Sequence, residues 1–303
     1  MAWCGSTPIF DTKSSLITTD GNILDWLDRP GDIDWHVYHD GLSFFALFPQ
    51  AWPHVLGSRF HDFETFLYDM KTRAPGKREV IIVEPSYQDG PHVGSDRPND
   101  NHPPLAVGWG EEFLRRTYEA VSANPERWAK TVMLLYYDEH GGFFDHASPK
   151  LVPYQTTGNP SHRFETTGPR VPALVISPLV ARGSVCKEFF DHTSVLQFLA
   201  ERFTPGVPYS AEVDARSKFG IASISKALLD TPRTDTAPAP SIAIPVSTTL
   251  GSTVAAPPNG DMQKAFERAA VGMMNNHPDE VGKKYPELFH WKAAADAARG
   301  VKS

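Results

Sequence analysis

The chain has 303 residues, of which 41% are hydrophobic and 21% are charged, the composition of an ordinary globular protein with a sizeable core. Its formal net charge of −7 provides no sequence-wide basic field, so we expect no nucleic-acid partner. No apolar stretch reaches the ~18 residues that would span a bilayer, and no signal peptide is visible, so no compartment is assigned. The two cysteines, Cys4 and Cys186, are isolated and form neither a disulfide framework nor a zinc motif.

Strand and helix patterns alternate along the first two thirds of the chain. A short amphipathic helix over residues 22–27 precedes a strand over residues 34–38, in which apolar and polar residues alternate. The next expected elements are a helix at 61–72, a continuous apolar strand at 80–83, a long loop at 86–108, a helix at 111–123, strands at 131–137 and 171–180, and a helix at 192–203 capped by Asp191. This order predicts an α/β domain with a mostly parallel sheet.

The C-terminal part differs in composition. Residues 229–260 are rich in Pro, Thr and Ser and predict a linker or an extended arm. Residues 261–303 are expected to form a helical segment, with one helix at 261–274 capped by Asp261 and another at 285–299. Residues 1–228 would then make up the α/β domain.

Polar side chains follow each predicted strand at its C-terminal end. His39 and Asp40 end the first strand, Glu84 ends the second, and Asp138, Glu139 and His140 follow the third. The loop after Glu84 adds the run Asn99-Asp100-Asn101-His102. Ligands of open parallel sheets bind beyond the carboxyl ends of the strands, so we expect these groups to converge on one edge.

The run Asp138-Glu139-His140-Gly141-Gly142-Phe143-Phe144-Asp145-His146 is the strongest local signal. Two adjacent carboxylates repel each other unless a cation or a shared proton relieves them, and hard divalent ions prefer such oxygen ligands. The glycine pair permits a sharp turn and a close approach of the backbone to a bound ion. We therefore predict a metal site with Asp138 and Glu139 as ligands. A solvated acidic turn is the alternative interpretation.

Three further residues are weaker catalytic candidates. His102 precedes two prolines that could present it rigidly to a phosphate oxygen, although an ordinary loop histidine is the commoner case. Glu84 is either a ligand or base, or a plain strand-end carboxylate, and His39 is a candidate through its place at a strand end. No Gly-x-Ser-x-Gly elbow and no P-loop occurs, so no nucleophile is assigned.

These segments resemble the phosphoesterase family, which holds bacterial and plant phospholipases C and an acid phosphatase. The run from Asp138 to His146 matches the family motif DExxGxxDH. Four other segments match in the same order: Glu84–Asp89, Asn99–Pro103, Gly168–Pro172 continuing to Ser177-Pro178, and Asp191–Ser194. The resemblance implies an alkaline-phosphatase-like α/β/α fold and a phosphoric ester hydrolase.

Site roles follow from the same resemblance. Asp138 and Glu139 would bind a divalent metal, with Ca, Mg or Mn favoured over Zn by the oxygen-rich ligands. His102 and His39 would contact the phosphate of a phospholipid or small phosphate ester. Supporting roles fall to His140, Asp145 and His146 of the same motif and to Arg170, which would brace the site through hydrogen bonds.

The sequence also departs from the family pattern. The Glu-Asn-Arg-Ser-Phe-Asp motif and the nucleophile motif Thr-x-Pro-Asn-Arg do not occur in these 303 residues. We therefore expect an N-terminally truncated member that lacks the first strand or strands, with impaired hydrolysis. The alternative is a non-catalytic binding or assembly module that associates with itself through an unpaired sheet edge. A sulfatase is disfavoured, because no C/S-x-P-x-R motif occurs.

Overall fold

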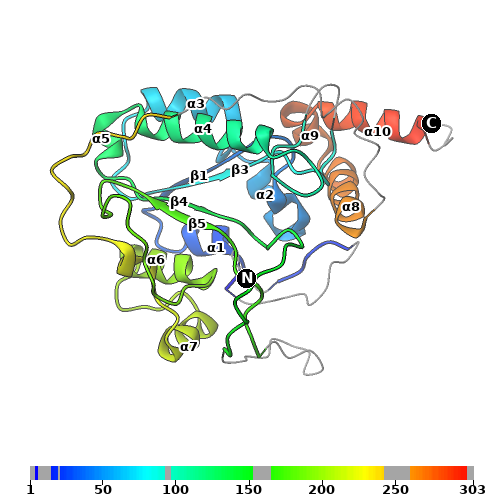
Figure 1. Cartoon of the computed structure of the whole chain (residues 1–303). Coiled ribbons are helices and arrows are strands. Elements are labelled where there is room, and N and C mark those ends of the chain that lie inside the picture. Colours follow the sequence, from blue (N-terminus) through cyan, green and yellow to red (C-terminus); the bar gives the residue numbers. More distant parts are fainter. Residues whose placement is uncertain are drawn as a thin grey trace.

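The computed structural model describes residues 4–5, 15–19, 21–92, 97–152, 165–241 and 260–298. Figure 1 shows a central group of strands with helices above and below it. This is the α/β architecture that the alternating sequence pattern predicts.

Three parallel strands form the main sheet in the order β2-β1-β3. The central strand β1 (Asp34–His39) pairs with β2 (Phe60–Asp62) on one side and with β3 (Glu79–Glu84) on the other. Trp35 and Val37 are buried in a core cluster on one face of the sheet, and Tyr38 is buried in a second cluster on the other face. The side chains alternate between the faces, so the sheet is covered on both sides.

The other two strands form a separate sheet. β4 (Met133–Tyr136) and β5 (Ala173–Ile176) run antiparallel, and no backbone hydrogen bond among the described residues joins β4 to β3. The sequence predicts a mostly parallel sheet, and this pair is the antiparallel exception among the described strands. A parallel pair needs a crossover connection, usually a helix, and the described part of the segment between β4 and β5 contains none.

One layer of helices covers both sheets. α3 (Phe63–Thr72), α4 (Gly108–Ser122) and α5 (Pro125–Trp128) bury aromatic side chains against Tyr38. Ile81 of β3 and Ile176 of β5 pack against the same cluster, so this layer connects the two sheets. α3 starts two residues later than predicted, because residues 60–62 pair with β1 and Asp62 caps the helix through the Thr65 amide.

The opposite face carries a larger core cluster. Its buried side chains come from β1, from 3-10 turns at Phe44–Leu47 and Pro49–Ala51, and from seven helices of the described chain: α1 (Ile23–Asp28), α2 (Trp52–Val55), α6 (Thr193–Phe203), α7 (Ala211–Phe219), α8 (Asp261–Asn276), α9 (Pro278–Lys284) and α10 (Glu287–Ala298). A third 3-10 turn spans Ile224–Ala227. Within the described ranges, no helix has both the length and the apolar character needed to cross a bilayer.

Two predicted helix caps are wrong. The N-cap of α6 is His192, and Asp191 lies one residue earlier, where its carboxylate accepts hydrogen bonds from the Thr193 amide and hydroxyl. The N-cap of α8 is Gly260, and Asp261 is the first helical residue. Carboxylates near a helix N-terminus still interact favourably with the helix dipole, which explains why both acids lie close to helix starts.

The C-terminal helices pack on the main core. Phe266, Ala269 and Met273 of α8 are buried in the same cluster as Trp35. In the described part of the predicted arm, residues 229–235 contact the segment after β5, and residues 236–241 lie against α4 and α5, where Trp128 Nε1 donates a hydrogen bond to the Thr236 carbonyl at 2.9 Å. Residues 242–259 of that arm lie outside the described residues, and the division into three parts stays a prediction.

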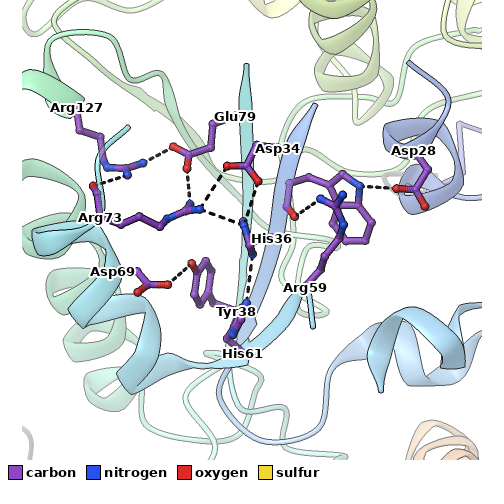
Figure 2. A network of polar contacts seen from close by, with 11 residues as sticks. Asp28, Asp34, His36, Tyr38, Arg59, His61, Asp69, Arg73, Glu79 and Arg127 are labelled. Carbon is purple, nitrogen blue, oxygen red and sulfur yellow. Dashed lines mark hydrogen bonds and ion pairs between the residues drawn. The ribbon is translucent and has the colours of Figure 1, made fainter. Parts of the chain in front are cut away.

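A polar network fastens α3 and α5 to the amino-terminal end of the sheet (Figure 2). Asp34 and Glu79 are register partners at the starts of β1 and β3. Arg73, which follows α3, forms ion pairs with both carboxylates. Glu79 also pairs with Arg127 of α5, whose side chain is only 4% exposed. These ion pairs hold α3 and α5 against the amino-terminal ends of β1 and β3. The predicted site residues lie at the opposite, carboxyl ends of the strands.

Candidate functional site

The carboxyl ends of β1 and β3 bring two predicted site residues together. His39 and Glu84 are register partners in neighbouring parallel strands, and both are almost fully buried. The sequence prediction that strand-end groups meet at one edge is therefore correct for this pair. The two side chains have different surroundings, and these surroundings determine the protonation state and the available hydrogen bonds of each.

Glu84 is a buried carboxyl group with hydroxyl neighbours. The Ser43 hydroxyl donates a hydrogen bond to Glu84 Oε2 at 2.5 Å, and the Tyr87 hydroxyl lies 3.5 Å from Oε1. Burial raises the pKa of Glu84 to about 7, although these hydrogen bonds oppose the shift. A carboxyl group with this pKa can take up or release a proton near neutral pH, which suits general acid–base chemistry.

His39 has both ring nitrogens engaged. Nδ1 lies 2.7 Å from the Gly41 carbonyl oxygen, and Nε2 lies 3.0 Å from the Tyr285 hydroxyl of the C-terminal segment. Burial lowers the pKa of His39 to about 4, so the ring is neutral at pH 7. A neutral ring that donates through Nδ1 must accept through Nε2. His39 therefore holds its neighbours in place and has no ring nitrogen left for a substrate.

Tyr87 connects the strand ends to the acidic turn and the long loop. Burial raises its pKa well above the ordinary value, and the nearby carboxylates of Glu84, Asp138 and Asp100 raise it further. Its ring packs against Phe266 of α8. Carboxyl groups from three separate segments thus act electrostatically on one phenol.

The described parts of the loop at 86–108, which are residues 86–92 and 97–108, fold back over the strand ends. Asn99 Nδ2 donates to Asp40 Oδ2 at 2.7 Å, and Asn99 Oδ1 accepts from the Ser86 amide at 2.7 Å. Asp100 Oδ2 accepts from the Gln88 amide at 2.7 Å. Two of these bonds join a side chain to the backbone and one joins two side chains, and together they hold residues 86–88 and 99–100 against each other and against the end of β1.

His102 lies on the exposed side of this loop. Its Nδ1 is 2.6 Å from the Pro103 carbonyl oxygen, which leaves Nε2 without a protein hydrogen bond among the described residues. Burial raises the pKa of both Asp89 and Asp100. The interaction of each carboxyl group with His102 opposes this rise in pKa. Unlike His39, this imidazole is accessible to a ligand.

The predicted metal ligands form an exposed turn. Asp138 Oδ1 accepts from the Glu139 amide at 3.0 Å, and Glu139 Oε2 accepts from the Gly141 amide at 2.8 Å. Gly141 and Gly142 have positive φ angles of 65° and 74°, the conformation for which a glycine pair is suited. His140 Nδ1 lies 3.5 Å from Glu139 Oε2. The glycine turn is present as predicted.

These two carboxylates do not make a metal site by themselves. No group of three or more His, Cys, Asp or Glu side chains in the described part of the chain is placed to hold a metal ion. Both carboxylates bond instead to the backbone of their own turn. The donor set is therefore incomplete for a Ca²⁺, Mg²⁺ or Mn²⁺ site, which needs about six oxygen ligands. The metal stays a prediction.

Asp145 and Arg170 join the turn to the segment before β5. Arg170 donates from Nε and from its terminal nitrogen to the two Asp145 oxygens, at 2.9 and 2.8 Å, and its amide donates at 3.0 Å. This guanidinium holds the pKa of the Asp145 carboxyl below its usual range. His146 is exposed, and its Nδ1 lies 3.8 Å from Asp145 Oδ1.

A cavity of about 460 Å³ lies beside the strand ends, a volume that suits a small ligand. Its lining residues are Asp40, Gly41, Ser86, Pro91, His92, Arg97, Asn99, Trp109, Glu112, Phe113 and Arg116. None of the predicted catalytic or metal residues lines it. The length of the 86–108 loop was a signal for part of this lining, and Asp40 directly follows His39. No local pattern marks the α4 residues as cavity wall.

The fold and these strand-end groups define an α/β protein with an ionisable site at the carboxyl edge of a parallel sheet. Residues 11–207 match the model of the phosphoesterase family. The match covers more than half of the chain, and the chain therefore belongs to the phosphoesterase family. This confirms the family that the sequence motifs indicate.

Curated relatives are phospholipases C from bacteria and plants. The chain is 42% identical to hemolytic phospholipase C of Pseudomonas aeruginosa over 114 residues, which are 34% of this chain and 16% of that protein. It is 27% identical to non-specific phospholipase C6 of Arabidopsis thaliana over 279 residues, 84% of this chain and 51% of that protein. Phospholipase C A of Mycobacterium tuberculosis is 35% identical over 125 residues, 35% of this chain and 23% of that protein. The chain thus spans about half or less of these relatives.

Proposed function

We propose that this chain carries the α/β core of a phosphate ester hydrolase of the phospholipase C type. The observation that carries the proposal is the approach of Glu84, Asp100 and Asp138 to Tyr87 at the carboxyl edge of the sheet, in a member of the phosphoesterase family. The proposed substrates are phospholipids or small phosphate esters, because the relatives are named phospholipases C.

Individual roles follow from accessibility and protonation. Glu84, with a pKa of about 7, would exchange protons through the hydroxyl groups of Ser43 and Tyr87. His102 would contact the phosphate, since its Nε2 is available. His39 enters as a positioning residue that holds the end of β1 through Gly41 and Tyr285.

A divalent metal would neutralise charge on the phosphate oxygens when bound. Asp138 and Glu139 are the oxygen donors offered for it, and support comes from their motif and from the interaction of Asp138 with Tyr87. No step proposed above depends on this ion. The residues His140, Asp145, His146 and Arg170 would shape the turn that carries the two donors.

We also propose that the chain alone turns over substrate far more slowly than a complete relative, because no Thr-x-Pro-Asn-Arg nucleophile motif occurs in its 303 residues. The test is hydrolysis of p-nitrophenyl phosphate and p-nitrophenylphosphorylcholine with added Mg, Mn or Ca, beside an Asp138→Ala/Glu139→Ala double variant. Metal-dependent turnover that the double variant abolishes supports the hydrolase. A rate equal to that of a complete relative contradicts the proposed impairment.

A second candidate function is a binding or assembly module, and the open outer edges of β3 and β4 among the described strands favour it. β3 and β4 have no described backbone bonds to each other, and Leu174 of β5 is 56% exposed. Open edges and uncovered apolar strand residues invite another strand, either from further chain or from a second copy. Self-association measured by light scattering, together with no turnover, would favour this function. A monomer that binds neither phosphate nor metal would count against it.

A further inference from the structure

The cavity beside the strand ends is lined on one side by residues near the ends of β1 and β3 and on the other side by residues of α4. Asp40, Ser86 and Asn99 form the floor at the ends of β1 and β3, and they are joined by the Asn99 hydrogen bonds described above. Trp109 and other α4 residues form the wall. Arg97 comes from the long loop and also lines the cavity. The cavity therefore lies beside the carboxyl ends of β1 and β3, next to the predicted catalytic residues but not lined by them.

Most charges that line the cavity are already compensated. Glu112 accepts two hydrogen bonds from Arg115, at 2.8 and 2.6 Å. Arg116 is paired with Glu64 at 2.6 Å. Asp40 accepts from Asn99 Nδ2 at 2.7 Å, which reduces its repulsion of an anion. These side chains would hold the shape of the cavity and add little net charge to it.

Arg97 is the exception. Its guanidinium carbon lies 5.0 Å from the centroid of the Trp109 ring, a cation–π arrangement. No carboxylate of the described residues is within ion-pair distance of it. The contact with the indole ring restrains the guanidinium, whose planar fork of N–H donors suits carboxylate and phosphate through two parallel hydrogen bonds.

His92 adds a second polar group to the lining. Its Nε2 lies 3.2 Å from the Gln88 carbonyl oxygen, so Nδ1 is the ring atom that can meet a ligand. The Ser86 hydroxyl has no hydrogen bond among the described residues, although the residue is only 3% exposed. Both groups can complement an oxyanion held by Arg97.

We infer that this cavity binds an anionic group through the guanidinium of Arg97, which the Trp109 ring holds in place. The identity of the anion as a phosphate rests on the proposed function, whereas binding itself does not require hydrolysis. The phosphate could belong to a lipid headgroup or to a free phosphate, and the two share the same recognition by Arg97.

The test is a titration of the ¹⁵N-labelled 303-residue chain at physiological salt, followed through the indole N–H signal of Trp109. A Trp109→Phe variant assigns that signal. The probes are inorganic phosphate and 2-aminoethylphosphonate, a headgroup analogue whose carbon–phosphorus bond is not hydrolysed. We expect a saturable shift of the Trp109 signal. Arg97→Gln should weaken binding at least tenfold, and Arg97→Lys should give an intermediate affinity, because it keeps the charge and loses the planar fork.

Arg182→Gln is the matched control. Arg182 is also exposed, but it pairs with Asp235 outside the cavity, so this variant should bind like the wild type. The absence of a saturable Trp109 shift, an unchanged affinity in Arg97→Gln, or an equal loss in Arg182→Gln would each overturn the inference. Tighter binding of the phosphonate assigns the site to a headgroup, and equal affinities assign it to the phosphate group alone.

The same experiment separates this inference from the proposed function. Arg97-dependent binding without turnover keeps the anion site and removes hydrolysis by this chain. If Arg97→Gln changes neither turnover nor binding, hydrolysis by this chain is kept and the anion site at Arg97 is removed.

Discussion

Replacing Glu84 with Gln should change how stability depends on pH. Burial raises the pKa of Glu84 from 4.5 to about 7, so the folded protein holds this proton more tightly than the unfolded chain. Between these values the folded state binds more protons, and the free energy of unfolding therefore falls as the pH rises. The difference between the two pKa values corresponds to a stabilisation of the folded state by about 3 kcal/mol. This stabilisation is fully present below pH 4.5 and is lost as the pH rises through about 7.

Gln fits the same space, carries no charge at any pH, and can still accept the hydrogen bond from Ser43. We expect the free energy of unfolding of Glu84→Gln to exceed that of the wild type by up to about 3 kcal/mol at alkaline pH, and to show no gain at acidic pH. Urea denaturation across this range measures the effect. Glu126→Gln is the control, because Glu126 is 72% exposed and should give the wild-type curve. A constant offset between Glu84→Gln and wild type at every pH would refute the reasoning.

His39 supplies an internal check of sign. Burial lowers its pKa from 6.5 to about 4, so the unfolded chain binds this proton more tightly than the folded protein. Its contribution is therefore present above pH 6.5 and lost as the pH falls to about 4. Between pH 4.5 and 6.5 the effects of His39 and Glu84 on the stability of the wild type oppose each other. The Glu84→Gln variant lacks the effect of the carboxyl group, so its free energy of unfolding should rise with pH in this range.

Two further predictions concern contacts around the site. Tyr285→Phe should destabilise the fold by about 1–3 kcal/mol, because it leaves His39 Nε2 buried without its hydrogen-bond partner; thermal unfolding measures this, and an unchanged melting temperature would show that the bond contributes nothing. Gly110→Ala should destabilise by about 1–3 kcal/mol, since a Cβ there would lie 1.9 Å from Asn101 Oδ1 and would displace the loop. Gly168→Ala is its control, because a Cβ at that position meets no atom within 4 Å, and equal unfolding free energies of the two variants would contradict the packing argument.

The sequence predicted the elements better than their pairing. The apolar run at 80–83 and the alternation at 34–38 identify strands directly, because burial on both faces of a sheet requires such side chains. The antiparallel pairing of β4 with β5 has no such signature. Strand direction depends on how the intervening segment returns to the sheet, and residues 137–172 contain no periodic pattern that reveals it.

The sequence predicted where the site residues lie, but it did not predict their protonation states. Strand-end placement identified His39 and Glu84, which are register partners. Their protonation depends mainly on burial, which the whole fold creates, and their hydrogen-bond partners Tyr285 and Ser43 lie 246 and 41 residues away in the sequence. Arg97 was not predicted as a site residue, because its significance comes from a ring contact with Trp109 across a loop and a helix. Local patterns carry no information about such distant partners.

The bond between Tyr285 and His39 also constrains the order of events during synthesis. Strand β1 leaves the ribosome long before Tyr285, which follows His39 by 246 residues. Until then the buried imidazole lacks one of its two partners, and the core lacks Phe266 and Met273 of α8. We expect the end of β1 to stay accessible to protease in nascent chains that stop before α8, and to become protected only once α8, α9 and Tyr285 have been made. The packing of α8 to α10 therefore acts as a closing step for a strand that is translated long before these helices.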